Sequence, residues 1–305
     1  MSSYAILNNL SKPQTIAMTS NIHFLKPNNS IYSTKIIDNS NAVGMSLNIS
    51  YGNAPGVPGE ESFALVNIEG NEYILDLGSA QFIVYQSGNY STEYPAVMTA
   101  HGVTETGYLQ PLTQVEMGGV NVNIYPLAVI PNSPRVFGLS TFGLLSTTLS
   151  PQLDMYVNQK APPIMSMLNQ GDRKFIMNLI NNKITFGSYQ HLGNEVNLIG
   201  RYRYIVPVSV TNSNVEYAIL DSGTTNYAEQ SGTDMNGETV TLAGYSFKLE
   251  KSNQDPSFSI DFSEYKKTLS VPQDSMIMII GLKYLRKFIF SIDIDNQTAK
   301  FYSPI

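Results

Sequence analysis

The sequence contains no cysteine, no tryptophan and three histidines, which are His23, His101 and His191. The missing thiols exclude cysteine nucleophiles, disulfide frameworks and zinc or iron sites ligated by cysteine. The three histidines are scattered along the chain, which does not favour a structural zinc site. We therefore expect neither a metal nor a cofactor.

Charged side chains are scarce as well. They make up 14% of the 305 residues, whereas a typical soluble domain has roughly 25%. Lys and Arg number 18 and Asp and Glu number 24, so the formal net charge is −6. A chain without an overall basic field does not attract phosphates, and nucleic acid is therefore not an expected partner.

Long apolar runs are also missing. No uninterrupted apolar stretch in the sequence reaches the roughly 18 residues that a membrane-spanning helix needs. The first twenty residues lack the basic and then apolar pattern of a Sec-type signal peptide. We expect no membrane partner, and the location stays open between the cytoplasm and export by a non-classical route.

The sequence is rich in patterns that are typical of β-strands. It has 19 Tyr and 13 Phe, and from Ser46 onward short apolar and β-branched runs alternate with Gly, Pro and Asn. Helical signals are few and lie at residues 150–159, 163–170 and 282–287. The length suggests two domains or one bilobal unit. We predict an all-β (mainly β) fold.

An internal repeat is the most specific feature of the chain. A hydrophobic run that ends in Asp-x-Gly and a hydroxyl residue occurs at residues 73–79 and again at 218–225. Each copy is followed by two hydrophobic residues and a glycine, 62 residues after the first aspartate and 60 residues after the second, at Gly138 and Gly281. This repetition predicts two structurally related halves.

The two repeated aspartates, Asp76 and Asp221, are the candidates for chemistry. If the halves pack about a pseudo-two-fold axis, their carboxyls lie side by side, and Gly78 and Gly223 allow the backbones to approach closely. Two adjacent carboxyls hold one proton over a wide pH range. The ionised carboxyl can accept a proton from water while the protonated one polarises a carbonyl, which suits amide hydrolysis. Two unrelated turns at strand ends are the simpler alternative.

These motifs resemble the pepsin-like family of bilobal aspartic proteases, from about Ser46 to the C-terminus. The resemblance rests on ILDLGS and ILDSGTT as the two active-site turns and on VFGL and IIGL, which contain Gly138 and Gly281. PIMSMLNQG and the final GLKYLRKFIFSIDIDNQTAKFY are similar to a helix and the last hairpin of the family. The resemblance implies a monomeric endopeptidase that cuts extended peptides or proteins in a cleft between two lobes.

By this resemblance the two aspartates are the catalytic pair, and the hydroxyls of Ser79 and Thr224 hydrogen-bond their outer oxygens. The second motif matches the family throughout and includes Ser222. In the first motif, Leu77 occupies the position where the family has Thr or Ser, whose hydroxyl bonds across the axis. Leu77 would also raise the pKa of the pair by desolvation. It leaves a second hypothesis, a pepsin-like protein that binds peptides or proteins without cutting them.

Family members close a hairpin called the flap over the substrate, with a Tyr near its tip. In this sequence His101, Gly102 and Thr104 are the flap candidates, and His101 stands nearest the expected Tyr. A solvent-facing polar role is the alternative for His101. The candidates for the substrate cleft are Thr225 and Ile83, the latter at a position where the family usually has Trp.

The resemblance divides the chain into an N-terminal arm (1–45), an N-terminal lobe (46–190) and a C-terminal lobe (191–305). Family members often carry an N-terminal prosegment whose basic residue plugs the cleft, and Lys35 is the candidate for that residue. The arm could instead add strands to the body of the protein. A third hypothesis is an enzyme whose main substrate is its own arm.

Two further segments have ordinary structural interpretations. Arg201 and Arg203 alternate in the run RYRYIVPV, which predicts that both lie on the exposed side of a strand. The segment Asp293–Asn296 starts like a calcium-binding loop but lacks the Gly and Glu that such a loop requires. It is predicted to be the turn of a hairpin.

Overall fold

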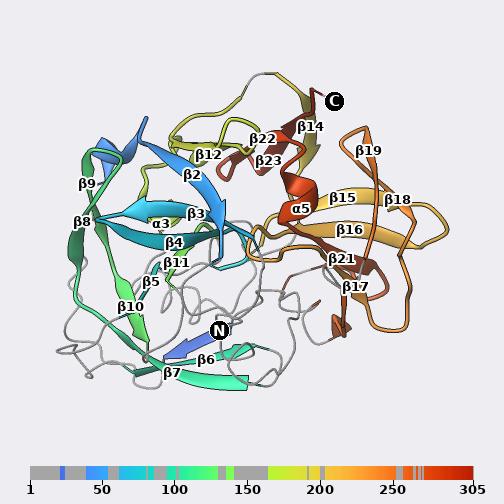
Figure 1. Ribbon diagram of the computed structural model, residues 1–305, viewed down its shortest axis with the longest axis horizontal. Helices are drawn as coiled ribbons and strands as arrows, with labels where there is room; N and C mark the ends of the chain where they lie inside the picture. Colours follow the sequence, from blue (N-terminus) through green and yellow to red (C-terminus); the bar gives the residue numbers. More distant parts are fainter. Residues whose placement is uncertain are drawn as a thin grey trace.

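The computed structural model describes residues 21–24, 39–53, 62–79, 82–85, 95–100, 103–129, 135–140, 164–190, 192–199, 203–251, 257–263, 266, 269 and 271–304. Within these ranges the protein consists mainly of strands, as the sequence predicts (Figure 1). The strands form one large sheet, a second sheet and a separate hairpin.

The largest sheet has 14 strands and includes segments from both ends of the chain. Its strands follow the order β1 (Asn21–Phe24), β6 (Pro95–Ala100), β7 (Val103–Leu109), β10 (Pro126–Val129), β5 (Phe82–Tyr85), β11 (Val136–Gly138), β4 (Asn71–Asp76), β3 (Phe63–Ile68), β2 (Ser46–Gly52), β13 (Lys183–Phe186), β12 (Lys174–Asn178), β22 (Ile289–Asp293), β23 (Thr298–Tyr302) and β14 (Asn194–Asn197). Strands from both predicted lobes therefore share this sheet, because β12 pairs with β22.

The second sheet has seven strands, all from the C-terminal part of the chain, and lies on the right in Figure 1. Its order is β19 (Tyr245–Lys248), β18 (Thr239–Leu242), β15 (Ile205–Val210), β16 (Val215–Leu220), β21 (Met276–Ile280), β17 (Tyr227–Gln230) and β20 (Phe258–Ile260). The separate hairpin consists of β8 (Thr113–Met117) and β9 (Val120–Ile124). Its turn uses Gly118 and Gly119 at φ of +54° and +82°, which glycine adopts without a steric penalty.

The predicted repeat appears as the same local strand order in both sheets. In the first, β4 lies parallel to β11, β11 lies antiparallel to β5, and β5 lies parallel to β10. In the second, β16 lies parallel to β21, β21 lies antiparallel to β17, and β17 lies parallel to β20. Because β4 ends at Asp76 and β16 ends just before Asp221, each aspartate leaves its sheet at an equivalent point.

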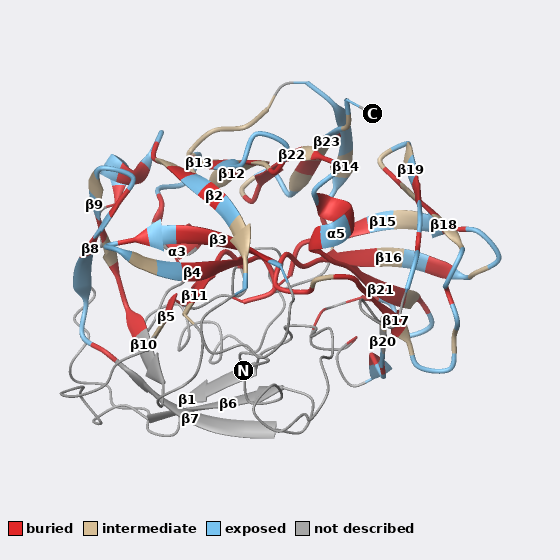
Figure 2. Cartoon of the chain, in the orientation of Figure 1, coloured by how far each residue is buried: buried red, intermediate tan, exposed pale blue. Residues whose placement is uncertain are grey.

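The central strands of both sheets are continuous apolar runs because they are covered on both faces. All three residues of β11 and four of the five residues of β21 are buried. By contrast, β12 and β13 alternate between buried and more exposed residues, as expected for strands with one face on the core. Figure 2 shows the buried residues concentrated where strands from the two sheets meet. The ends of β4 and β16 lie in this buried region.

The helices of the described residues are short. The prediction for 163–170 corresponds to α3 (Ile164–Met167), and that for 282–287 corresponds to α5 (Leu282–Leu285), which is preceded by Gly281. Residues 150–159 lie outside the described residues. No helix in the described part is long and apolar enough to cross a bilayer. The predicted hairpin turn at Asp293–Asn296 is confirmed, because β22 and β23 pair on either side of it.

Two parts of the predicted arm are described. The strand β1 pairs with β6 in antiparallel register, from Asn21 opposite Thr99 to Phe24 opposite Ala96. Residues 40–42 form a short 3-10 helix, η1, and Asn39 exchanges hydrogen bonds with Asn123 of 2.9 and 2.8 Å. Both parts thus contact the body of the protein. Lys35 lies outside the described residues.

The requirement for glycine at position 281, which belongs to the second copy of the repeat, can be tested by measuring protein stability. A Cβ at this position would lie 1.8 Å from the backbone oxygen of Asn226 and 2.5 Å from that of Thr224. We expect Gly281→Ala to lower the free energy of unfolding by about 3 kcal/mol or more, because backbone must move. The matched control is Gly52→Ala, where the nearest atom is a Leu65 methyl at 3.7 Å. Urea unfolding of both variants measures these changes. Similar decreases in the free energy of unfolding of the two variants would contradict the prediction.

Candidate active site

The two Asp-x-Gly turns meet, and the carboxyls of Asp76 and Asp221 share a hydrogen bond. The approach requires glycine at position 78, because a Cβ there would lie 2.6–2.7 Å from the carboxylate atoms of Asp221. Gly281 has an equivalent packing role against the turn of the second aspartate, and Gly138 lies opposite Asp76 in the parallel pair of β11 and β4. The structure therefore brings together the aspartates that the repeat singles out.

Each aspartate is held by the same two donors of its own turn. In the first turn, the N–H of Gly78 donates to Asp76 Oδ1 at 2.7 Å, and the Ser79 hydroxyl donates to Oδ2. In the second, the N–H of Gly223 donates to Asp221 Oδ1 at 2.9 Å and the Thr224 hydroxyl donates to Oδ2 at 3.0 Å. Both outer carboxyl oxygens are thus oriented by a neighbouring hydroxyl.

Ser222 connects the second turn to the first. Its hydroxyl accepts a hydrogen bond from the Leu77 N–H at 3.0 Å and donates to the Leu75 carbonyl at 2.7 Å. Leu77 occupies the equivalent position in the first turn and has no hydroxyl, and its side chain is part of the buried apolar core. One serine therefore makes both side-chain bonds of this cross-connection.

Burial dominates the electrostatics of the pair. The pKa of Asp76 is raised by desolvation, and hydrogen bonds from Ser79, Asp221 and Gly78 oppose this increase. The pKa of Asp221 is raised well above its ordinary value, first by desolvation and then by the charge of Asp76. Both carboxyls are shifted in the same direction, so the pair titrates as a unit and keeps a proton to a higher pH than free carboxyls would.

Arg203 also acts on the pair, contrary to the prediction that it is exposed. Arg203 is only 4% exposed, and it precedes β15 instead of lying within that strand. Its positive charge lowers the pKa of Asp76. The sequence signal was misleading because alternation in RYRYIVPV assumes a strand that begins at Arg201. Arg201 itself lies outside the described residues.

The predicted cleft residues differ in their surroundings. Ile83 is 1% exposed in β5, where it pairs with Val136 of β11 and Leu127 of β10, so it lies in the interior of the sheet. Ile83 was predicted to line the cleft because the family usually has Trp at its position. That correspondence does not show that neighbouring strands cover an apolar residue in a central strand. Thr225 follows the second turn and is half-buried. Its backbone oxygen accepts a hydrogen bond from the Lys283 N–H at 2.9 Å.

The predicted flap falls on the hairpin of β6 and β7. These strands pair from Pro95 opposite Tyr108 to Ala100 opposite Val103, and Thr104 pairs with Thr99. His101 and Gly102 lie outside the described residues. The geometry thus establishes a hairpin at this place in the chain, and its role over a substrate remains a prediction.

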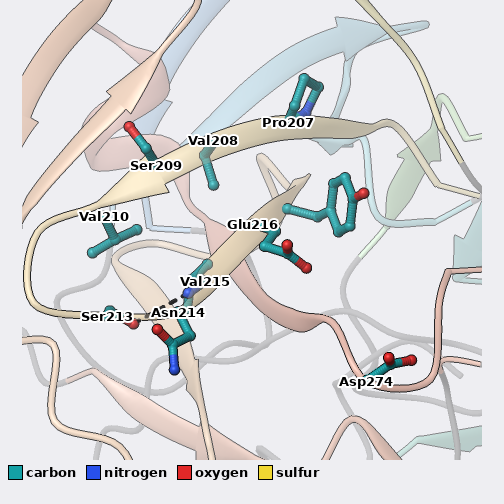
Figure 3. A pocket seen from close by; sticks show the side chains of 10 residues that line it. Pro207, Val208, Ser209, Val210, Ser213, Asn214, Val215, Glu216 and Asp274 are labelled. Carbon is teal, nitrogen blue, oxygen red and sulfur yellow. Dashed lines mark hydrogen bonds between the residues drawn. The ribbon is translucent and has the colours of Figure 1, made fainter.

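A separate depression of about 610 Å³ lies over β15 and β16 (Figure 3). The depression is lined by the start of β16, whereas Asp221 follows the other end of that strand. Its lining residues are Pro207, Val208, Ser209, Val210, Ser213, Asn214, Val215, Glu216, Tyr217 and Asp274. None of them belongs to the Asp-x-Gly turns, so we assign this depression no part in the chemistry of the pair.

No protein-family model matches the chain, and a search of curated proteins finds no significant match. Within the described residues, no group of three or more His, Cys, Asp or Glu side chains is arranged to hold a metal ion. The carboxyl pair of Asp76 and Asp221 is therefore the feature of the described residues that bears on function.

The cross-connection by Ser222 can be tested by unfolding. Ser222→Ala leaves the buried N–H of Leu77 and the buried carbonyl of Leu75 without their side-chain partner. We expect the free energy of unfolding to fall by about 2–4 kcal/mol. The control is Ser246→Ala, on an exposed serine that bonds Thr241, which should change it by less than about 0.5 kcal/mol. Equal effects would show that the bonds of Ser222 do not stabilise the turns.

The raised pKa values predict a pH-dependent stability. A carboxyl whose pKa is higher in the folded protein stabilises it below the unfolded pKa of about 4, and this contribution is lost as the pH rises through the folded pKa. Asp221→Asn removes the more strongly raised group. We expect the variant to exceed the wild type in free energy of unfolding at pH 7 by on the order of 1 kcal/mol or more, with the difference shrinking toward pH 4.

Urea unfolding across this pH range measures the difference. The control is Asp234→Asn, because the exposed Asp234 accepts a hydrogen bond from Lys251 that lowers its pKa, so its contribution has the opposite sign. A gain for Asp221→Asn that does not change between pH 4 and pH 7 would contradict the predicted pKa directions.

Proposed function

We propose that the protein is an aspartic endopeptidase with a pepsin-like, bilobal fold and that Asp76 and Asp221 are its catalytic pair. The observation that carries the proposal is the hydrogen bond between two buried carboxyls, each at the end of an equivalent strand and each held by its own Gly N–H and hydroxyl. The matching strand orders around β11 and β21 support the internal duplication that such a fold requires.

A carboxyl pair that holds one proton suits peptide hydrolysis. Ionised Asp76 accepts a proton from a water molecule, whose oxygen attacks the carbonyl carbon, while Asp221 gives its proton to the carbonyl oxygen. When the resulting diol collapses, the C–N bond breaks, the amine nitrogen takes the proton held by Asp76, and a hydroxyl proton returns to Asp221. The starting protonation state is restored, and neither a covalent intermediate nor a metal takes part.

The substrate of the proposed enzyme is an extended peptide. The hairpin of β6 and β7 is the candidate flap. Among the described strands, β1 pairs with the outer edge of β6 and β10 pairs with residues 107–109 of β7. A peptide could pair as an additional strand with residues 103–106 of β7, while its side chains at alternate positions occupy pockets. Backbone pairing of this kind recognises the conformation of a peptide more than its sequence. It therefore accounts for an endopeptidase without specifying which bond it cuts.

A second candidate function is peptide or protein binding without cleavage. Leu77 favours it, because this buried apolar side chain removes one of the two hydroxyl braces expected between the turns. With a single brace from Ser222, the carboxyls could be oriented less tightly during the reaction. The two functions differ in one observable: both predict peptide binding, and only the first predicts cut products.

The deciding experiment is a mass-spectrometric digest of an unstructured peptide library from acid to neutral pH. We expect the wild type to cut and Asp221→Asn and Asp76→Asn to lose about 10²- to 10⁴-fold in rate. Asp274→Asn, which changes an exposed carboxylate in the separate depression, is the matched control and should cut like the wild type. Absence of cutting by the wild type at every pH, with peptide binding retained, would favour the binding function.

A further inference from the structure

A positive charge is buried next to the carboxyl pair. The Arg203 side chain is 4% exposed, and a guanidinium keeps its charge at all ordinary pH values. Burying a charge is costly unless an opposite charge and hydrogen bonds compensate it. The charge of Arg203 lowers the pKa of Asp76, as does a hydrogen bond with Asp221 at the end of β16. Arg203 is therefore placed where an ionised Asp76 offsets its charge.

A short series of contacts connects Arg203 with Asp76. Arg203 Nη1 donates to the Ser140 hydroxyl at 3.5 Å, and the Ser140 N–H donates to the Ser79 carbonyl at 2.9 Å. The Ser79 hydroxyl in turn donates to Asp76 Oδ2. Ser79 and Ser140 are almost completely buried, at 1% and 0% exposed. These contacts therefore lie in the protein interior, where the low dielectric strengthens electrostatic interactions.

The next residue, Tyr204, holds this arginine in place relative to both aspartates. Its buried hydroxyl donates to the Leu139 carbonyl at 2.5 Å, and the Leu139 N–H donates to the Asp76 carbonyl at 2.8 Å. The Tyr204 carbonyl accepts from the N–H of Leu220, the residue before Asp221, at 2.9 Å. The backbone at Arg203 is thereby anchored next to both turns.

We propose that Arg203 is a positioning residue, which keeps the negative charge of the carboxyl pair on Asp76 and the shared proton on Asp221 through its contact with Ser140. For its role in catalysis this inference rests on the proposed function, while the charge distribution itself does not. The two turns have the same internal hydrogen bonds, so a charge that acts on one carboxyl favours its ionisation and creates a difference between the base and the acid. Arg203 supplies that difference from one side of the pair.

The test is the titration of Asp76, followed by NMR of protein with ¹³C-labelled aspartate carboxyls and assigned with Asp76→Asn and Asp221→Asn. Arg203→Met removes the charge, and we expect the carboxyl of Asp76 to titrate at a pH higher by about one unit. Arg203→Lys keeps a cation and should titrate close to the wild type. If the protein cuts peptides, the acid limb of its pH profile moves in the same direction in Arg203→Met.

Controls separate this role from a structural one. Arg286→Met removes an exposed arginine that stacks on the Tyr51 ring at 3.8 Å, and it should leave the titration of Asp76 unchanged. If Arg203→Met does not fold, Ser140→Ala takes its place and should move the titration in the same direction by a smaller amount. An unmoved titration in a folded variant of Arg203 or Ser140 overturns the proposal. A moved titration in a protein that cuts no peptide supports it and rejects only the endopeptidase function.

Discussion

The hydrogen bond between the carboxyls of Asp76 and Asp221 is the interaction on which the rest of the site depends. Two carboxyls with almost no exposure to water cannot both be ionised at low cost, so the pair keeps a proton and becomes a combined acid and base. Several neighbouring residues allow this contact or stabilise it. Gly78 leaves room for the opposite carboxyl, Gly281 leaves room for the second turn, and Ser222 joins the two turns.

The site combines a symmetric scaffold with asymmetric surroundings. Equivalent strands deliver the two aspartates, and equivalent N–H and hydroxyl donors hold them. The symmetry ends at Leu77, which packs in the core where Ser222 makes hydrogen bonds, and at Arg203, whose charge acts on Asp76. Symmetric contacts alone would leave the two carboxyls equivalent, whereas acid and base roles require their pKa values to differ.

Much of the fold could be predicted from the sequence because its signals are local. Short apolar and β-branched runs separated by Gly, Pro and Asn predicted the mainly β fold, and the helical signal at 282–287 corresponds to α5. The repeat of Asp-x-Gly with a later glycine identified both aspartates, since two copies in register are much less common by chance than one. Side-chain exposure was harder to predict. Ile83 pairs with strands distant in sequence, and the buried Arg203 bonds Ser140, which lies 63 positions away, so neither the alternation nor a family position could reveal their surroundings.

The sequence by itself determined the mainly β architecture, the internal repeat and the two candidate aspartates, because propensity, periodicity and motif spacing are properties of short segments. Only the tertiary structure decided that the carboxyls touch, that one serine makes both side-chain bonds of the cross-connection, and that a buried arginine acts on Asp76. These features depend on contacts between residues such as Leu77 and Ser222, which lie 145 positions apart. The balance of desolvation and charge at such contacts exists only after the chain has folded.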